Sequence, residues 1–258
     1  MALKLFHKKH RKHHTETWNQ KTMFGPNMNF AVTEAYKLLR TNLMFSFSDE
    51  GRGHVIGITS AIQSEGKSSS ACNVAYALSE AGKKVLLLEA DLRRPSIPAK
   101  LGVTRIPGLT NLLVSRWDYK EVVQHCQEAP NLDIIASGDI PPNPSELLAS
   151  NRMEQLMQEL TRDYDYIIMD LPPVTVVSDA VAVSKVLDGV VVVVRSEVSD
   201  RKMLAEAVRL LKLVNVRILG MVFRDSATVH RRYSSYKKKY RSKYYNRYYG
   251  QDEKKDEK

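Results

Sequence analysis

The sequence has few cysteines and no long apolar run, and both shortages exclude whole classes of protein. Cys72 and Cys126 are the only cysteines in 258 residues, which rules out a disulfide scaffold and a CxxC metal site. The longest apolar stretch surrounds Val190–Val194 and is well short of the ~18 residues of a membrane-spanning helix. The N-terminus lacks the apolar core of a signal peptide. We therefore expect a reduced, cytoplasmic protein without a membrane span of its own.

Net charge is nearly absent from the middle of the chain, although the whole protein is basic. Lysine and arginine number 39 against 29 acidic residues, which gives a net charge of +10. Residues 1–14 hold five basic residues and residues 231–249 hold eight, with no acid in either segment. The excess charge therefore lies in two arms around a near-neutral body. Such arms suit solvated tails, or contact with nucleic acid, anionic lipid or acidic protein.

The apolar pattern predicts a helix at 29–46, followed by strands that alternate with helices. The expected strands are Val55–Thr59, Val85–Leu88, Asn131–Ala136, Tyr166–Met169, Gly189–Val194 and Ile218–Phe223. The expected helices are Lys67–Ala81, a stretch near Tyr119–His125, one capped by Ser145, Ser178–Val186, and one running from a Ser199 cap to Val214. Several strands are apolar on both faces, as a helix-covered parallel sheet requires. The expected fold class is therefore α/β, a mostly parallel sheet with helices on both faces.

The most specific motif lies between the first of these strands and the helix that follows it. Residues 60–68 read Ser-Ala-Ile-Gln-Ser-Glu-Gly-Lys-Ser, which fits the P-loop pattern GxxxxGK[ST] with Ala61 in place of the first glycine. In such a loop, backbone N–H groups and the helix N-terminus surround polyphosphate oxygens. Lys67 would add a mobile positive charge, Ser68 a hydroxyl for Mg²⁺, and Gly66 room for close backbone approach. The predicted nucleotide-binding residues are Gln63, Ser64, Glu65, Gly66, Lys67, Ser68 and Ser69.

Acidic residues follow two further strands. Asp170 ends the apolar strand Tyr166–Met169, which is typical of a Walker B carboxylate. Glu89 and Asp91 come directly after Val85–Leu88. Because the carboxyl ends of parallel strands meet at one edge of a sheet, we expect these acids to lie close to the P-loop. We predict Mg²⁺ ligands at Ser68 and Asp170, and catalytic roles for Lys67, Glu89, Asp91 and Asp170.

The C-terminal segment concentrates tyrosine. Seven of the twelve tyrosines fall in the 17 residues from 233 to 249, among lysines and arginines and without any aliphatic residue. This composition cannot form a core, so we expect a mobile tail. One hypothesis makes the tail a phosphorylation substrate, and the other makes it a stacking arm for RNA or single-stranded DNA. The candidate phosphorylation sites are Tyr233, Tyr236, Tyr240, Tyr244, Tyr245, Tyr248 and Tyr249.

In this combination the chain resembles the cytoplasmic domain of the bacterial tyrosine kinases, the BY-kinases of capsule and exopolysaccharide systems. The resemblance runs from about Glu34 to Phe223 and includes the tail. The matching motifs are the P-loop, Glu89-Ala-Asp91-Leu-Arg93, Pro142-Asn-Pro-Ser-Glu-Leu-Leu148, Asp170-Leu-Pro-Pro-Val174 and Ser178-Asp179-Ala180. The resemblance implies a P-loop NTPase-like kinase domain at 27–228, between a basic His/Lys-rich arm at 1–26 and a disordered tyrosine-rich tail at 229–258.

The resemblance also implies the activity and its partners. An ATP-dependent protein-tyrosine kinase with Mg²⁺ would phosphorylate its own tail and regulate capsule or exopolysaccharide synthesis or export. Glu34, Lys37 and Arg40 match the helix motif through which the family forms ring-shaped homo-oligomers. The implied partners are a transmembrane activator, the polysaccharide co-polymerase, and a cognate tyrosine phosphatase, and no nucleic acid is expected. The activator would hold the kinase at the inner face of the membrane.

Five positions depart from the family's pattern. Lys37 replaces an arginine, Glu89 replaces the usual aspartate, and Gln63-Ser64 replaces Pro-Gly. Arg224 stands where the family often has an asparagine near the base. A carboxylate displaced by ~1 Å costs some enzymes ~10²-fold in rate. A weakly active or inactive scaffold, whose basic tail binds nucleic acid or anionic membrane, is therefore a second hypothesis.

A third hypothesis is a deviant-Walker ATPase, the class that partitions DNA or positions division sites. Proteins of that class carry a lysine early in the P-loop that reaches across a dimer. The corresponding residue in this chain is Ile62, which argues against the hypothesis, as does the tyrosine-rich tail. Phosphotyrosine formed with Mg-ATP would separate the kinase from both other hypotheses, and ADP release without phosphotyrosine would favour the partitioning ATPase.

Overall fold

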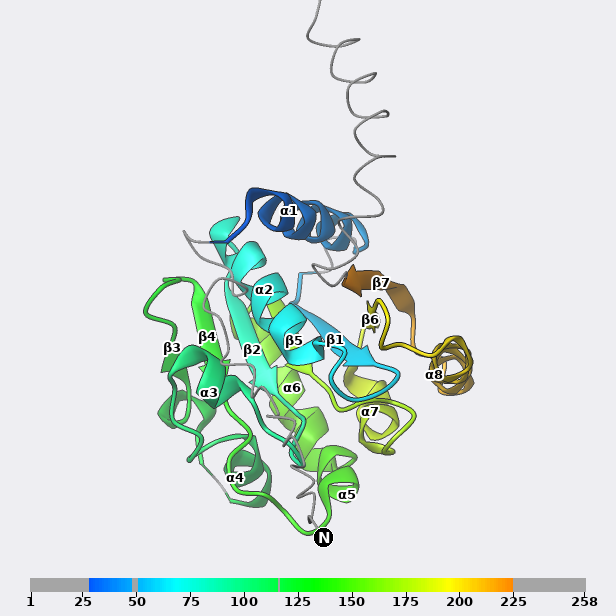
Figure 1. The fold of residues 1–258 in the computed structure, drawn as a ribbon. Helices are drawn as coiled ribbons and strands as arrows, with labels where there is room; N and C mark the ends of the chain where they lie inside the picture. Colours follow the sequence, from blue (N-terminus) through cyan, green and yellow to red (C-terminus); the bar gives the residue numbers. More distant parts are fainter. Residues whose placement is uncertain (1–27, 48–50, 116, 225–258) are drawn as a thin grey trace, which may run out of the picture.

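The computed structural model describes residues 28–47, 51–115 and 117–224, and the N-terminal arm and the tyrosine-rich tail lie outside these ranges. Within the described residues a seven-stranded sheet has the order β3-β4-β2-β5-β1-β6-β7 (Figure 1). The strands are β1 (His54–Ser60), β2 (Val85–Glu89), β3 (Gln124–His125), β4 (Leu132–Ile135), β5 (Tyr166–Asp170), β6 (Gly189–Arg195) and β7 (Ile218–Arg224). All pairings are parallel except that of β3 with β4. The predicted α/β class with a mostly parallel sheet is confirmed.

Helices cover both faces of this sheet, as the two-sided apolar strands predicted. The helices are α1 (Phe30–Phe45), α2 (Lys67–Glu80), α3 (Ile97–Leu101), α4 (Leu109–Val114), α5 (Pro144–Leu148), α6 (Asn151–Asp163), α7 (Asp179–Ala182) and α8 (Arg201–Leu213), with the 3₁₀ turns η2 (Tyr119–Glu121) and η3 (Ser184–Val186). One core packs α1, α2 and α3 against the sheet, and the other packs α4, α6 and α8 against its opposite face (Figure 1). Alternate side chains of β1 accordingly enter different cores: Val55 lies in one, Ile56 and Ile58 in the other.

The segment between β2 and β5 differs from the sequence-based expectation. The helix expected near Tyr119–His125 is a single turn, η2, followed by the edge strand β3. The short helices α3 and α4 were not predicted, because five or six residues carry too little periodicity. Tertiary burial stabilises them instead, as the fully buried Ile97 and Leu109 show. No helix in the described ranges is long and apolar enough to cross a membrane.

Parallel pairing brings the carboxyl ends of six strands to one edge of the sheet. The terminal residues there are Ser60 of β1, Glu89 of β2, Ile135 of β4, Asp170 of β5, Arg195 of β6 and Arg224 of β7. Glu89 pairs in register with Asp170, and Arg195 pairs in register with Arg224. Two acids therefore lie on one side of β1, and two arginines lie on the other. The loop between β1 and α2 lies between these opposite charges.

Candidate active site

The P-loop leaves the first turn of α2 open. Gly66, which precedes Lys67 at the start of the helix, has a φ of 92°, a left-handed conformation that glycine adopts without strain. Ser64 also has a positive φ, of 66°. No side chain caps α2, so the N–H groups of its first turn remain for an external acceptor. Together with the helix dipole, this arrangement suits phosphate oxygens.

Glu65 braces the loop from inside. Its buried carboxylate accepts a hydrogen bond from the Ile62 N–H at 2.8 Å and another from the Ser199 hydroxyl. The Ser199 oxygen in turn accepts from the Arg195 N–H at 2.7 Å. The sequence predicted Ser199 as a helix cap, which is wrong, because Asp200 caps α8 and leaves the serine free to hold the P-loop. Glu65 thus shapes the nucleotide loop rather than facing a ligand with its carboxylate.

Arginines hold the outer side of the loop. Arg195 donates from Nη1 to the Ser64 carbonyl at 3.1 Å, and Arg94 donates from Nη1 to the Gln63 side-chain oxygen at 2.8 Å. Both contacts fall on the Gln63-Ser64 pair, where the sequence departs from Pro-Gly. In the family's pattern a proline restricts the backbone at this place. In this chain the two hydrogen bonds, from β6 and from the β2–α3 loop, hold the loop instead.

Lys67 lies between two carboxylates. Its Nζ is 2.7 Å from Asp91 Oδ2 and 3.4 Å from Asp170 Oδ1, and its side chain is only 12% exposed. Burial alone would lower the pKa of Lys67, but the two carboxylates outweigh this effect and raise that pKa above its ordinary value. Burial raises the pKa of Asp170, and Lys67 offsets part of that rise. The sequence-predicted lysine and two of the predicted acids therefore meet at one point.

The residues around this cluster fit a nucleotide with its magnesium. Asp170 Oδ2 and Ser69 Oγ are buried and have no hydrogen-bond partner among the described residues. Ser68 lies beside them, with its hydroxyl oxygen 3.3 Å from Lys67 Nζ. The described residues contain no group of three or more His, Cys, Asp or Glu side chains that could enclose a metal. Mg²⁺ takes one or two carboxylates and completes its shell with water and substrate phosphates, and the Asp170 carboxylate and the Ser68 hydroxyl are groups that could bind it.

Glu89 turns away from this cluster. Its fully buried carboxylate accepts from the N–H groups of Ser96 at 2.5 Å, Ile97 at 2.7 Å and Ser137 at 3.1 Å. Burial raises the pKa of Glu89, and the backbone donors at Ile97 and Ser96 oppose that rise. The geometry gives Glu89 a positioning role: it ties the loop that carries Asp91 to the start of α3. It offers no support for the catalytic role that the sequence predicted.

Shortening this side chain should destabilise the protein even though aspartate is the family's usual residue. Glu89→Asp cannot reach all three N–H groups, so at least one buried donor loses its acceptor, a loss of about 1–3 kcal/mol. We expect urea unfolding to show a free energy of unfolding lower by that amount. The same substitution at the exposed Glu80 of α2 is the control and should change little. Equal stability of the Glu89→Asp protein and the wild type would contradict the positioning role.

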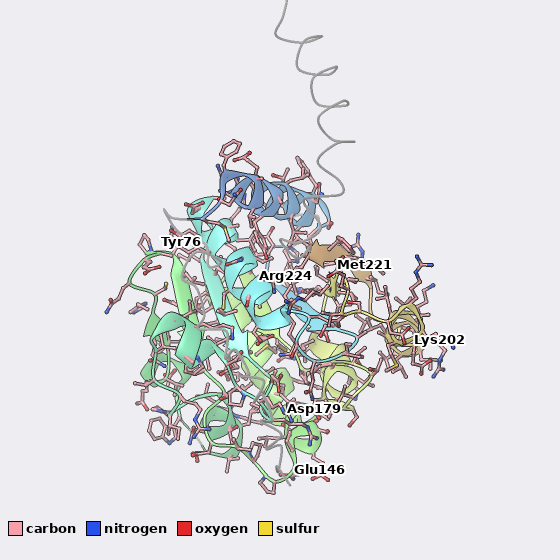
Figure 2. All side chains as sticks on the ribbon, in the orientation of Figure 1. Tyr76, Glu146, Asp179, Lys202, Met221 and Arg224 are labelled. Carbon is pink, nitrogen blue, oxygen red and sulfur yellow. The ribbon has the colours of Figure 1, made fainter. Side chains whose placement is uncertain are left out.

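Asp179 links three segments at the same edge. Its buried carboxylate accepts from Arg93 Nε at 2.8 Å, from Arg93 Nη2 at 3.0 Å, and from the Ser145 hydroxyl. Figure 2 shows Asp179 near Glu146 of α5. Ser145 was predicted as a helix cap, which is wrong, because Asn143 occupies the N-cap position. The serine instead joins α5 to α7, and Arg93 anchors the β2–α3 loop to both.

The α1 residues predicted for assembly behave differently from one another. Glu34 and Lys37 form an ion pair of 3.0 Å on the exposed side of α1, with nearly half of each side chain exposed. Arg40 instead donates to the Ala77 carbonyl of α2 at 3.0 Å and fastens α1 to the domain. The seven tail tyrosines lie outside the described residues.

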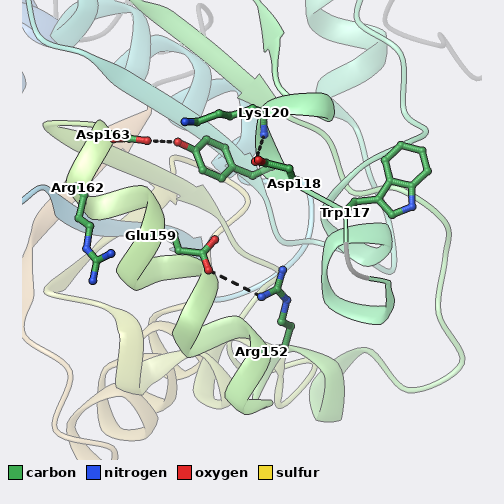
Figure 3. Close-up of a pocket in the computed structure, with 8 residues that line it drawn as sticks. Trp117, Asp118, Lys120, Arg152, Glu159, Arg162 and Asp163 are labelled. Atoms are coloured by element: carbon green, nitrogen blue, oxygen red, sulfur yellow. Dashed lines mark hydrogen bonds and ion pairs between the residues drawn. The ribbon is translucent and has the colours of Figure 1, made fainter.

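A separate hollow of about 480 Å³ lies between η2 and α6 (Figure 3). Arg152 and Glu159 form an ion pair of 3.9 Å there, and the Tyr119 hydroxyl donates to Asp163. Burial and the Asp163 carboxylate raise the pKa of Tyr119, so its hydroxyl stays neutral. The three acidic and three basic side chains that line this hollow balance, so it offers no net charge to a ligand.

Sequence reasoning missed the residues that support the site. The bonds of Ser199 to Glu65 and of Arg195 to Ser64 join segments more than 130 positions apart, and no local pattern signals them. One signal was available for Arg195, which ends an apolar strand as Asp170 does. A search of the strand ends for charged residues of either sign, and not for acids alone, would have identified Arg195.

Comparison with known proteins places this site in a family. The model of the ParA family, described as NUBPL iron-transfer P-loop NTPase, matches residues 52–251. Tyrosine-protein kinase YwqD of Bacillus subtilis (strain 168) is 37% identical over 205 residues, 79% of this chain and 86% of that protein. Putative tyrosine-protein kinase CapB of Staphylococcus aureus is 30% identical over 74% of this chain and 83% of its own length. Of the longer putative kinase EpsB of Ralstonia solanacearum, the match covers 27%.

Solved structures of tyrosine kinases also resemble this chain. The kinase domain of Escherichia coli tyrosine kinase ETK matches with a TM-score of 0.71 and 32% identity over 75% of both chains. The septum site-determining protein MinD of Pyrococcus horikoshii, at 22% identity and a TM-score of 0.57, shares the fold alone. The protein therefore belongs to the ParA family of P-loop NTPases and, within it, to the bacterial tyrosine-protein kinases.

Proposed function

We propose that this kinase transfers the γ-phosphoryl group of ATP to tyrosines of its own C-terminal tail. One observation carries the proposal: Lys67 stands between Asp91 and Asp170 at the uncapped start of α2, on the sheet edge where β7 ends at Arg224. In the sequence the tail begins at residue 229, five positions after Arg224. The P-loop and the end of β7, the last described element before the tyrosine-rich tail in the sequence, therefore share one edge.

The residues of the site divide the work of phosphoryl transfer. The transition state is loose, so positioning and charge neutralisation dominate its stabilisation. Lys67 would exchange its carboxylate partners for the phosphates, which the N–H groups of the first α2 turn also hold. Ser68 and Asp170 would hold Mg²⁺, which neutralises phosphate charge when bound. Asp91, released by Lys67, would accept the proton of the attacking tyrosine hydroxyl, whose free pKa is ~10. The tyrosine oxygen then bonds to the γ-phosphorus as the bond from the γ-phosphorus to ADP breaks and ADP leaves.

Chain length allows the tail to reach the site. Tyr233 lies nine positions after Arg224 in the sequence, and Tyr249 lies 25 positions after it. Flexible segments of these lengths span about 17 Å and 28 Å. The tail predicted from composition could therefore reach its own P-loop or that of a neighbouring subunit.

Incubation with Mg-ATP tests the proposal directly. We expect the wild-type protein to gain phosphotyrosine, detected by blotting and mapped by mass spectrometry to the seven tail positions. A variant with all seven tail tyrosines changed to phenylalanine keeps the charge of the tail and should lose nearly all of the signal. ATP hydrolysis without phosphotyrosine would contradict the proposal and support a partitioning ATPase instead. Binding of RNA or anionic vesicles without any turnover would support the scaffold.

Assembly through α1 is part of the same proposal. The helix exposes large apolar side chains, among them Phe30, Leu38 and Phe45, beside the Glu34–Lys37 ion pair. An exposed apolar helix face next to paired charges suits contact with a second copy of the chain. We expect Leu38→Asp to shift the protein toward monomer in sedimentation velocity, whereas Lys202→Asp on α8 should leave the distribution unchanged. Identical distributions for the Leu38→Asp and wild-type proteins would contradict this interface.

The cellular role is proposed from the family. A solved structure with 34% identity to this chain is that of the chimerical protein CapA2B2, whose name carries a second component beside the name CapB of the Staphylococcus aureus relative. We propose a corresponding transmembrane activator for this kinase, which would hold it at the inner face of the membrane in capsule or exopolysaccharide synthesis. Phosphorylation measured with and without a peptide from the cytoplasmic end of a candidate activator tests the partnership.

A further inference from the structure

The end of strand β7 places an arginine against the P-loop. A Cβ atom added to Gly66 would lie 1.5 Å from Nη1 of Arg224, 2.6 Å from its Cζ and 3.1 Å from its Cδ. The guanidinium therefore rests directly on Gly66, at the start of α2. In the view of Figure 2, Arg224 lies beside this helix. A side chain at position 66 would displace the guanidinium from this place, so Gly66 serves both the left-handed turn of the loop and the contact with Arg224.

This arginine lacks a counter-charge. Within the described ranges its guanidinium makes no hydrogen bond or ion pair, although the side chain is partly buried. The nearby cations already have partners: Lys67 pairs with Asp91 and Asp170, and Arg195 binds the Ser64 carbonyl. Glu65, the acid within the loop, is held by the Ile62 N–H and the Ser199 hydroxyl.

The position is electrostatically unfavourable unless an anion joins it. The first turn of an α-helix carries a partial positive charge, which repels a cation placed there. Arg224 adds a full positive charge at that end of α2, and Lys67 lies in the same turn. A bound polyphosphate would turn this repulsion into attraction, because its oxygens suit both the N–H groups and a guanidinium fork.

We infer that Arg224 is a phosphate-binding residue of the nucleotide site, a second cation that the edge strand adds to the one the P-loop supplies. The inference rests on the proposed nucleotide site and extends it to a residue outside the P-loop and the acidic motifs. Its consequence is that nucleotide affinity depends on the residue that ends β7, five positions before the tyrosine-rich tail in the sequence.

Equilibrium binding of a fluorescent ADP analogue in Mg²⁺ tests the inference without reference to activity. We expect Arg224→Gln to weaken binding about tenfold or more, as loss of a hydrogen bond to a charged group predicts. Arg224→Lys keeps the charge without the fork and should retain part of the affinity. Arg217→Gln removes the same charge near the other end of β7 and should bind like the wild type. Thermal melting of each variant verifies that it is folded.

Competition with inorganic pyrophosphate identifies the part of the nucleotide that Arg224 contacts. We expect Arg224→Gln to weaken pyrophosphate and ADP in parallel. An unchanged pyrophosphate affinity beside a weakened ADP affinity would assign Arg224 to the base and overturn the inference. Wild-type affinity in both Arg224→Gln and Arg224→Lys would also overturn the inference about Arg224. In that case the proposed nucleotide site would still stand if Lys67→Met abolished binding. A wild-type protein that binds neither ligand would instead refute the nucleotide site.

Discussion

Replacing Lys67 with methionine should lower tail phosphorylation by about 10²–10³-fold, the usual cost of removing one preorganised contact to developing charge. Methionine nearly preserves the length and the apolar stem of lysine, so the loss isolates the charge. The partners of that charge, Asp91 at 2.7 Å and Asp170 at 3.4 Å, already hold it at the start of α2. The effect should appear in the rate of phosphotyrosine formation at saturating Mg-ATP.

Two further measurements separate chemistry from folding in this variant. Lys202→Met on α8 removes an exposed lysine and should phosphorylate at the wild-type rate. Removal of Lys67 also leaves Asp170 buried beside Asp91 without a cation, so the melting temperature of the Lys67→Met protein should fall at pH 8. A Lys67→Met protein that melts normally and still phosphorylates its tail would show that another group carries the γ-phosphate charge.

The sequence was sufficient for the architecture because the signals that define it are local. Two-sided apolar strands, and a glycine-lysine turn after the first of them, predicted a helix-covered parallel sheet with a P-loop at one edge. Asp170 follows from the same logic, since it ends an apolar strand and the sheet places strand ends together. Periodicity missed α3 and α4, which are too short to show it, and wrongly predicted a helix near Tyr119–His125, where the chain forms the turn η2 and the strand β3.

The support of the site could not be predicted, because it depends on contacts between distant segments. Glu89 was expected near the metal from its place in an acidic motif, yet its carboxylate binds the backbone of Ser96, Ile97 and Ser137. Arg224 stood out in the sequence only as a departure from the family. Its contact with Gly66 exists because β6 and β7 lie next to β1 in the sheet. No local sequence pattern encodes this strand order.

Asp170→Asn should have two opposite effects: loss of phosphorylation and a gain in stability. Burial raises the pKa of Asp170 in the folded protein, so the ionised side chain costs folding energy above that pKa. The stability of the wild type therefore falls as the pH rises from the pKa of Asp170 in the unfolded chain, 3.8, through its raised pKa in the folded protein. Asparagine removes the buried charge, and Lys67 keeps its 2.7 Å partner Asp91. The metal ligand is removed at the same time.

Thermal melting in EDTA without nucleotide, from pH 4 to pH 8, measures the predicted trend. The difference in melting temperature, Asp170→Asn minus wild type, should be near zero at pH 4 and grow more positive as the pH rises. Glu80→Gln on the surface of α2 should show no such trend, and a less stable Asp170→Asn protein at pH 8 would contradict the argument. The double variant Lys67→Met/Asp170→Asn should recover the stability lost in Lys67→Met while remaining inactive. That outcome would mean that the charges of this site are retained for phosphoryl transfer, at the expense of the fold that holds them.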